Sequence, residues 1–207
     1  MVQYNPKYVR KILECQYAQL TNNIQARYLL SIELKNDSNE IATFVMMNPS
    51  RADYNTSDVT VNKVIKFAFI KGKGRIGIIN IVNLFPFYET NSNVLQSIIN
   101  RVRSNPNLNF KQIMARNNHI IKKAFQTSDY IIFAWGNPSK NIDKQLHLNQ
   151  CSIISSYVKT LNPSRTYVIK THHKEILTKG GYPRHPSRPA LNGFKKCVIS
   201  ENGKIII

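Results

Sequence analysis

Acidic residues are scarce in this sequence. Only 11 of the 207 residues are Asp or Glu, against 29 Lys and Arg, so the formal net charge is +18 at pH 7. An excess of this size produces a positive field that attracts polyanions and speeds their capture. The basic residues do not gather into one amphipathic helix, which disfavours a membrane surface as the partner. We therefore expect a nucleic acid to be the partner.

Cysteine is also scarce, and histidine shows no metal-ligand spacing. Cys15, Cys151 and Cys197 are far apart and form no CxxC pair, which argues against a disulfide framework and against a zinc ribbon. The five histidines form no HExxH or comparable motif. We expect no metal site and no cofactor.

Long apolar runs are absent as well. The N-terminal segment has no apolar stretch of signal-peptide type, and no segment approaches the roughly 18 consecutive apolar residues that a membrane helix needs. We therefore expect a soluble, cytoplasmic, monomeric protein. A chain of 207 residues is long enough for one full hydrophobic core, so we expect a single domain over residues 1–207.

The first third of the chain predicts a helix followed by a hairpin. Residues Lys7 to Leu20 follow Pro6, a residue that is common in the first turn of helices, and predict an N-terminal helix. Arg27 to Leu34 and Ile41 to Met47 are strand-like and flank the polar segment KNDSNE, which has turn chemistry. This pattern predicts a β-hairpin.

The rest of the chain alternates apolar strand-like runs with amphipathic stretches. Strands are predicted around Val45, Ile79, Ile132 and Val168. Helical spacing appears over residues 61–68, 110–125 and 142–161. Such alternation predicts a three-layer α/β/α fold with a central, mostly parallel four-stranded sheet.

Polar, proline-bearing loops follow these strands. In chain order they read MMNPSRAD, NLFPFYET, WGNPSK and PRHPSRP. In open α/β sheets, ligands bind in the crevice beyond the carboxyl ends of the strands. We therefore expect the four loops to form the functional site.

The order and placement of these loops resemble the uracil-DNA glycosylase superfamily. Within it, the chain is most similar to the uncharacterised domain-of-unknown-function family 1643, which has the same strand-NPS-x-AD, NLF, AWG and PRHP segments. The likeness extends from about Ile41 to Phe194 and implies a uracil-DNA glycosylase-like fold.

The resemblance implies roles for several strand-end residues. Asn48, followed by Pro49 and Ser50, matches the position that places the attacking water. Asn83 matches the amide that reads the edge of a flipped uracil, since a carboxamide both donates and accepts. His185 matches the histidine that stabilises the departing uracil anion.

Most of these residues also have a structural interpretation. Asn48 and Asn83 could satisfy only loop backbone groups. Trp135, which matches a superfamily Trp-Gly pair, could be a base contact or a packing residue. His185 could be a surface-loop histidine.

The most active superfamily members carry Asp where this chain has Asn48. Asp53 and Asp58 lie in the same loop, and either could supply the carboxylate or be a turn or cap residue. Tyr54 is the nearest candidate for the aromatic side chain that stacks on the base.

Further residues are candidates for contacts with DNA. Leu191 matches the wedge that fills the space left by the extruded base. The basic turn KGKGR could contact phosphates or be a solvated loop. The DNA-contact candidates are Ser187, Arg184, Arg188, Leu191, Lys73 and Arg75.

These observations predict a monofunctional DNA glycosylase that flips uracil out of single- or double-stranded DNA and hydrolyses its N-glycosidic bond. The resemblance also implies that an acidic DNA-mimicking inhibitor protein could bind the basic groove. The alternative is a non-catalytic DNA-binding protein on the same scaffold. An enzyme of free nucleotides is disfavoured, because a small substrate needs no extended positive surface.

Overall fold

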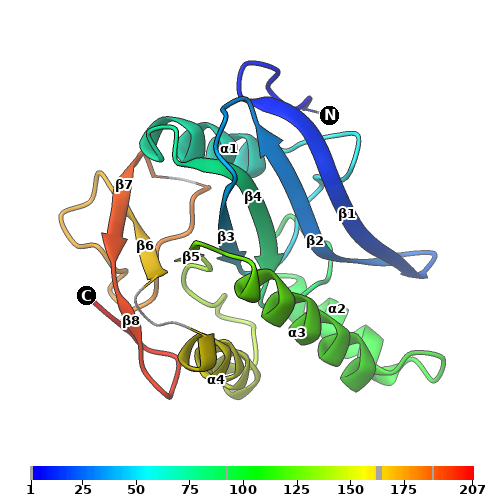
Figure 1. The fold of residues 1–207 in the computed structure, drawn as a ribbon. Coiled ribbons are helices and arrows are strands. Elements are labelled where there is room, and N and C mark those ends of the chain that lie inside the picture. The colour runs from blue at the N-terminus through cyan, green and yellow to red at the C-terminus, as the bar shows by residue number, and fades with distance from the viewer. Residues whose placement is uncertain (1, 92, 162–164, 188) are drawn as a thin grey trace.

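The computed structural model describes residues 2–91, 93–161, 165–187 and 189–207 and shows a mixed α/β fold (Figure 1). The strands are β1 Val9–Thr21, β2 Ile24–Leu34, β3 Glu40–Met46, β4 Ile76–Asn83, β5 Tyr130–Phe133, β6 Thr166–Thr171, β7 Leu191–Lys196, β8 Val198–Ile199 and β9 Ile205–Ile206. The helices are α1 Val59–Lys71, α2 Leu95–Ser104, α3 Phe110–Gln126 and α4 Lys144–Leu161.

The main sheet has seven strands in the order β1-β2-β4-β3-β5-β6-β7. The four predicted strands, β3 to β6, are all present, and they are parallel neighbours at its centre. The prediction of four strands was nevertheless too small, because β1, β2 and β7 extend the sheet with antiparallel pairings. A separate two-stranded sheet is formed by β8 and β9.

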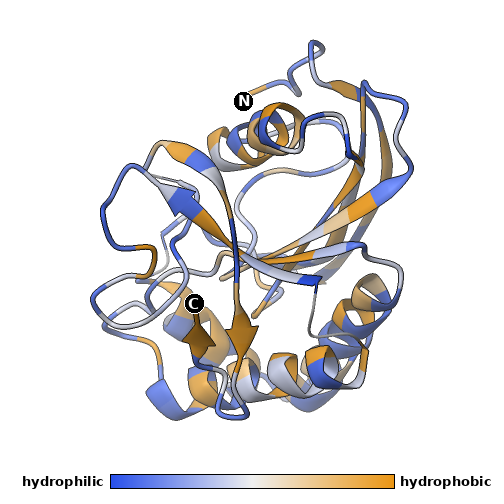
Figure 2. Ribbon diagram, turned by 60° about the vertical axis from the view of Figure 1, so that its left-hand side comes forward, coloured by the Kyte–Doolittle hydropathy of each residue, from blue (hydrophilic) through white to orange (hydrophobic). Residues whose placement is uncertain are grey.

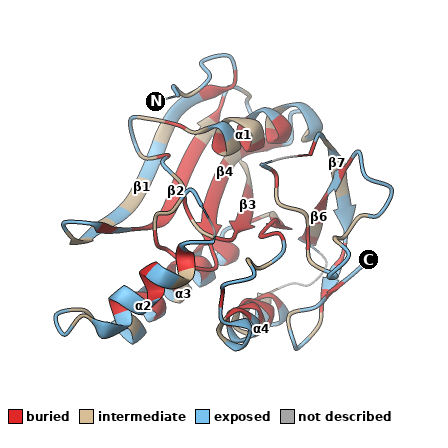
Figure 3. Ribbon diagram, turned by 180° about the vertical axis from the view of Figure 1, so that it is seen from behind, coloured by how far each residue is buried: buried red, intermediate tan, exposed pale blue. Residues whose placement is uncertain are grey.

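Burial across the sheet explains why the central strands were recognised. Strands β2, β3 and β4 are buried along most of their length, whereas the edge strands β1 and β7 are largely exposed (Figure 3). Apolar residues accordingly predominate in the central strands, and polar residues predominate in the outer loops (Figure 2). A strand that is buried on both faces is a continuous apolar run, but an exposed edge strand is not.

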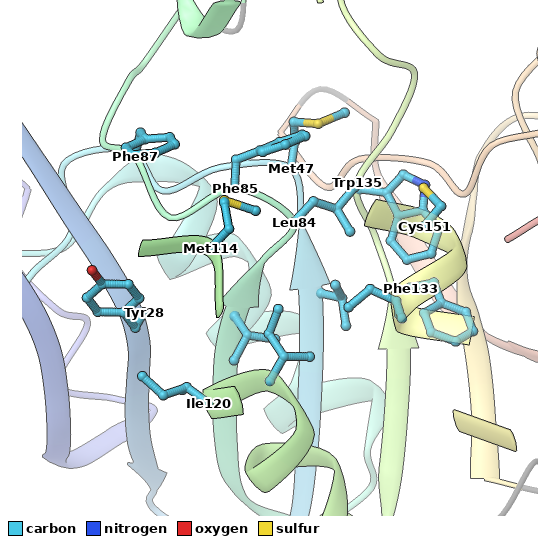
Figure 4. Close-up of a cluster of buried hydrophobic side chains, with 14 of the residues drawn as sticks. Tyr28, Met47, Leu84, Phe85, Phe87, Met114, Ile120, Phe133, Trp135 and Cys151 are labelled. Atoms are coloured by element: carbon cyan, nitrogen blue, oxygen red, sulfur yellow. The ribbon is translucent and has the colours of Figure 1, made fainter. Parts of the chain in front are cut away.

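Helices cover both faces of the sheet, as the three-layer prediction requires. One face packs against α1, through a cluster that includes Val64 and Ile65. The other face packs against α2, α3 and α4, through a larger cluster that includes Phe85, Phe133 and Trp135 (Figure 4). The predicted helices are found as α1, α3 and α4, whereas α2 was not predicted.

The predicted N-terminal helix is wrong. Residues Val9–Thr21 form β1, a long edge strand that pairs with β2 along its whole length and is irregular at four places. Its exposed positions carry helix-compatible residues such as Lys11, Glu14 and Gln19, and these concealed its strand character. Pairing with a buried neighbour overrides local propensity at such an edge.

The predicted hairpin of β2 and β3 is also wrong, although both strands exist. Strand β4 lies between them, antiparallel to β2 and parallel to β3. The connecting segment crosses the start of β4, where a Cβ atom on Gly77 would lie only 1.5 Å from the Ser38 carbonyl oxygen. Glycine at residue 77 therefore permits the crossing, and Asn36 fixes it by donating to the Ile76 carbonyl at 2.6 Å.

None of the helices in the described segments is both long enough and apolar enough to cross a bilayer.

Candidate active site

A cavity of about 490 Å³ lies at the carboxyl ends of the parallel strands. Residues from the loops after β3, β4, β5 and β6 line it, as the sheet rule predicts. We call it the four-loop cavity. Its lining includes the predicted site residues Asn48, Ser50, Trp135, Arg184, His185 and Ser187.

Asn48 joins the first two loops. Its side-chain amide donates to the carbonyl oxygen of Glu89 at 2.6 Å and to that of Pro49 at 3.1 Å. The Glu89 backbone N–H in turn donates to the Pro49 carbonyl at 2.9 Å. Both amide hydrogens of Asn48 therefore stabilise the loops, so Oδ1 is the atom left to accept a bond from a water molecule. Asn48 thus satisfies loop backbone groups, and a water-orienting role is compatible with these bonds.

Glu89 is the carboxylate among the residues that line the four-loop cavity. Its Oε1 accepts from the Asn91 backbone N–H at 2.7 Å and from the Thr90 hydroxyl at 3.4 Å. Its segment, NLFPFYET, was predicted to be a strand-end loop of the site, but Glu89 itself was not predicted as a site residue. The available signal was an acidic residue in a strand-end loop of a chain that has few acids.

Asp53 and Asp58 are turn and cap residues, and neither lines the four-loop cavity. Asp53 Oδ1 accepts from the backbone N–H groups of Asn55 and Thr56 at 2.8 and 2.7 Å. Asp58 caps α1 by accepting from the Val61 N–H at 2.8 Å, and its other oxygen accepts from the Ser50 hydroxyl. The structure does not support Asp53 or Asp58 as the base, because neither lines the cavity and each carboxylate holds the loop through at least one oxygen.

The loop after β3 is further fixed from β2. Arg27 is fully buried and donates to the Ala52 carbonyl, which also accepts from the Tyr88 hydroxyl at 3.1 Å. The Arg27 guanidinium lies 5.7 Å from the centre of the Tyr88 ring. Burial raises the pKa of Tyr88 to about 12, against the opposing charge of Arg27. Arg27 was not among the residues predicted from the sequence, although a charged residue inside an apolar strand was the available signal.

His185 has a defined hydrogen-bonding state. Its Nδ1 accepts from the Ser187 backbone N–H at 3.2 Å and lies 2.9 Å from the Ser187 hydroxyl oxygen. A neutral imidazole whose Nδ1 accepts carries its proton on Nε2, which makes Nε2–H a donor. His185 also contacts the loop after β5: a Cβ atom on Gly136 would lie 2.8 Å from the His185 Cβ. The third and fourth loops are therefore packed directly against each other.

Trp135 is a packing residue that also lines the four-loop cavity. Its side chain is 1% exposed, packs 5.2 Å from the Phe133 ring centre and also lines the four-loop cavity (Figure 4). Its Nε1–H has no hydrogen-bond partner within the described residues. Close by, Asn137 accepts from the Thr178 hydroxyl at 2.5 Å, which ties the third loop to the fourth.

Asn83 ends β4 beside Met46 and is fully buried. It is not among the residues that line the four-loop cavity, and neither of its amide atoms has a partner in the described part of the chain. Its backbone carbonyl accepts from Asn117 at 3.0 Å. The structure does not bring Asn83 together with Asn48 and His185.

The basic residues that are candidates for DNA contact lie at two different edges of the sheet. Arg184 lines the four-loop cavity and donates to the Glu175 carbonyl at 3.0 Å, and Lys63 of α1 donates to the Ser187 carbonyl at 3.2 Å. His173 also lines it, and its pKa lies below the ordinary value because of desolvation and the neighbouring charge of Arg184. Arg184 and Lys63 provide positive charge at the rim of the cavity.

Lys73 and Arg75 do not belong to this rim. They lie in the turn between α1 and β4, at the amino ends of the parallel strands, where they line a separate hollow of about 290 Å³. Lys73 and Arg75 are therefore not placed beside the other candidate DNA contacts, because a parallel sheet has strand starts and strand ends on opposite edges.

Leu191 and Tyr54 also lie outside the four-loop cavity. Leu191 is the first residue of β7, pairs with Thr171 and packs against the α1-side cluster, so it is not presented as a free wedge. Tyr54 is exposed and lines a neighbouring hollow. Arg188 lies outside the described residues. Among those described, no group of three or more His, Cys, Asp or Glu side chains could hold a metal ion.

Comparison with known proteins gives a family. The family model described as "Protein of unknown function (DUF1643)" matches residues 27–187. This match confirms the family that the loop motifs predicted. A search of curated proteins and a search of solved structures each found no match.

Proposed function

Because this chain belongs to the DUF1643 family, whose description gives no activity, we propose its function from its site: it is a DNA glycosylase that hydrolyses the N-glycosidic bond of uracil. One observation carries the proposal. Asn48, Glu89 and His185 line the same cavity, and its volume of about 490 Å³ suits a small ligand. The resemblance of the strand-end loops to the uracil-DNA glycosylase superfamily supports uracil as the base.

The first half of the reaction is the attack of water. Asn48 Oδ1 accepts a hydrogen bond from the water, and the Glu89 carboxylate takes its proton as the oxygen bonds to C1′ of the sugar. Oε2 of Glu89 is the suitable atom, since Oε1 already accepts from Asn91. The neutral Asn48 orients the water and does not act as the base.

The second half is the departure of uracil. As the bond between C1′ and N1 breaks, its electron pair moves into the pyrimidine and negative charge develops on the ring oxygens. The His185 Nε2–H donates to one of these oxygens, and the bonds at Nδ1 hold the proton on Nε2. A preorganised donor of this kind typically contributes about 3 to 4 kcal/mol to transition-state stabilisation.

The positive rim supports DNA as the substrate. The net charge of +18 favours a polyanion, and Arg184 and Lys63 lie beside the loop that carries His185. Phosphates on either side of the extruded nucleotide would be held there, while the base enters the cavity.

The test is base release from uracil-containing oligonucleotides, with alkali used to cleave the abasic sites. We expect product from the native protein. Glu89→Gln and His185→Ala should each lower the single-turnover rate by a factor of about 100 or more. His119→Ala is the matched control, since His119 is exposed on α3, away from the cavity. Absence of product at high protein excess, on single and double strands, would contradict the proposal.

The buried position of Asn83 favours a second candidate, a DNA-binding protein without catalysis. This alternative predicts salt-sensitive DNA binding with equal affinity for uracil and thymine at the target position. Loss of base release in His185→Ala with unchanged DNA affinity would reject it.

A further inference from the structure

The exposed aromatic side chains are concentrated at one place. Among the described residues, the large exposed hydrophobic side chains include just two aromatic ones, Tyr17 at 62% and Tyr54 at 57% exposure. Both line one hollow of about 580 Å³, although they are far apart in the sequence. Exposed aromatic rings on a basic protein are the usual platform for unpaired bases.

Each of the two rings is held on fixed backbone. Tyr17 lies on β1 directly opposite Arg27 of β2. Tyr54 lies in the turn from Asp53 to Thr56, which is closed by the Asp53 N–H donating to the Thr56 carbonyl at 2.8 Å. Both rings are therefore exposed on ordered segments.

The hollow also has a fixed aromatic wall. Tyr88 lines it, and the Tyr88 hydroxyl donates to the Ala52 carbonyl at 3.1 Å. The buried guanidinium of Arg27 lies 5.7 Å from the Tyr88 ring centre, and its Nε and Nη2 have no partner within the described residues. Arg51 lines the hollow together with the acidic Asp53 and Glu89, and the buried Arg27 places a further positive charge beside the Tyr88 ring.

This hollow adjoins the four-loop cavity. Ser50, Glu89 and Thr90 line both of them. A chain whose target nucleotide occupies the four-loop cavity would thus place the adjoining nucleotides over the tyrosines.

We infer that the hollow lined by Tyr17, Tyr54 and Tyr88 binds unpaired nucleotides next to the target base, so that the substrate is single-stranded nucleic acid. The inference rests on the proposed function for the identity of the target base, but not for binding itself. Bases within a duplex have both faces covered by their neighbours, whereas unpaired bases stack readily on tyrosine rings.

The test is the affinity for a fluorescein-labelled single-stranded DNA of 12 thymidines, measured by anisotropy. From the cost of losing a base–aromatic stack, we expect Tyr54→Ala and Tyr17→Ala each to weaken binding by roughly 5- to 100-fold. Tyr54→Phe should retain the native affinity, because the stacking ring remains. Leu148→Ala is the matched control, since Leu148 is an exposed apolar side chain on α4.

A second measurement uses duplex DNA of the same length. The tyrosine substitutions should change duplex affinity less than twofold, because paired bases do not reach the rings. Equal losses on single and double strands, or no loss on single strands, would overturn the inference. Native affinity of Tyr54→Ala for DNA, combined with loss of a bound peptide, would instead identify a protein-binding surface and overturn it too.

The outcomes for this inference and for the proposed function are separable. If the tyrosine variants bind single-stranded DNA more weakly and the native protein releases no base, the nucleotide-binding hollow is supported and the glycosylase function is contradicted. Base release that persists at the native rate and affinity in Tyr17→Ala and Tyr54→Ala supports the glycosylase and contradicts the hollow. Both tyrosines are exposed, so circular dichroism should show native folding in each variant.

Discussion

Gly136 and His185 lie so close together that a Cβ atom on Gly136 would be 2.8 Å from the Cβ of His185. Gly136 also has a φ of +76°, in the left-handed region that L side chains rarely adopt. The loop after β5 thus needs glycine at this residue for two reasons, and one of them concerns the proposed anion-stabilising histidine. The position of His185 is determined by contact with its neighbouring loop.

Gly136→Ala should therefore impair base release more than it impairs folding. Left-handed backbone strain should lower the free energy of unfolding by about 1–2 kcal/mol. Displacement of His185 should lower the base-release rate on the order of 100-fold, because catalysis is sensitive to misplacements of about 1 Å. Urea unfolding and single-turnover kinetics measure the two effects.

Gly181→Ala is the matched control for this substitution. Gly181 has a φ of +77°, but a Cβ atom there would meet nothing within 4 Å. It should show similar destabilisation and a nearly native rate. Equal loss of rate in the two variants would mean that the contact with His185 is unimportant.

Asp58 and Glu89 should respond in opposite ways to removal of their charge. Asp58→Ala should lower the free energy of unfolding by about 1–2 kcal/mol, because it removes the α1 cap and the acceptor for Ser50. Asp58→Asn, which retains a capping oxygen, should keep most of the stability and of the base-release rate. Glu89→Gln should instead remove activity with little change in stability, as measured by urea unfolding.

The comparison distinguishes the two candidate bases. If Asp58→Asn abolished base release and Glu89→Gln retained the native rate, Asp58 and not Glu89 would be the residue that accepts the proton of the attacking water.

The sequence was most informative where burial is extensive. The parallel strands β3 to β6 are mostly buried, and their order along the chain predicted both the strand direction and the edge of the sheet that carries the site. The loop motifs correctly placed Asn48, Trp135 and His185 on one cavity. Short polar loops after buried strands are a local signal that needs no knowledge of long-range pairing.

The errors arise where long-range contacts decide the structure. Strand β1 is an exposed edge whose partner is chosen by tertiary pairing, so its composition resembles that of a helix. The insertion of β4 between β2 and β3 depends on Gly77, whose crossing contact with Ser38 has no local signature. Glu89 was overlooked because its position in the cavity depends on a contact between two loops. The Asn48 amide, 41 residues away in the sequence, donates to the Glu89 carbonyl.

His147 should make the fold sensitive to acid. It is buried on α4, and burial lowers its pKa to about 4 from the ordinary 6.5. The unfolded chain therefore binds a proton as the pH falls through 6.5, while the folded chain does not until near pH 4. The contribution of His147 to the free energy of unfolding is fully present above pH 6.5 and decreases as the pH falls toward 4. At pH 4.5 the decrease is roughly 2 kcal/mol.

His147→Leu tests this prediction, because leucine has no titrating group. The difference in free energy of unfolding between pH 7 and pH 4.5, from urea titrations, should be smaller in the variant by roughly 2 kcal/mol. His119→Leu, at an exposed residue of α3, should leave the difference unchanged. An identical pH dependence in His147→Leu and the native protein would show that His147 does not titrate as described.

Arg184 and the pair Lys73 and Arg75 lie at different edges of the sheet, so their removal should change the salt dependence of DNA binding to different extents. Arg184 lies at the four-loop cavity, so Arg184→Ala should weaken DNA binding and reduce the slope of log affinity against log salt concentration by about 1, as for one lost phosphate contact. Lys73 and Arg75 lie at the opposite edge, so the double substitution to alanine should leave the slope nearly unchanged.

Arg184→Lys separates charge from loop structure in this experiment. Arg184 also donates to the Glu175 carbonyl at 3.0 Å, so alanine could act by releasing the loop. Lysine keeps the charge and should retain the native slope, even if the Nε hydrogen bond is lost, because counterion release follows the number of phosphates neutralised. A slope that falls equally in Arg184→Lys and Arg184→Ala would assign the effect to the loop. A slope that falls most in the Lys73 and Arg75 variant would place the nucleic acid at the amino edge of the sheet and contradict the proposed site.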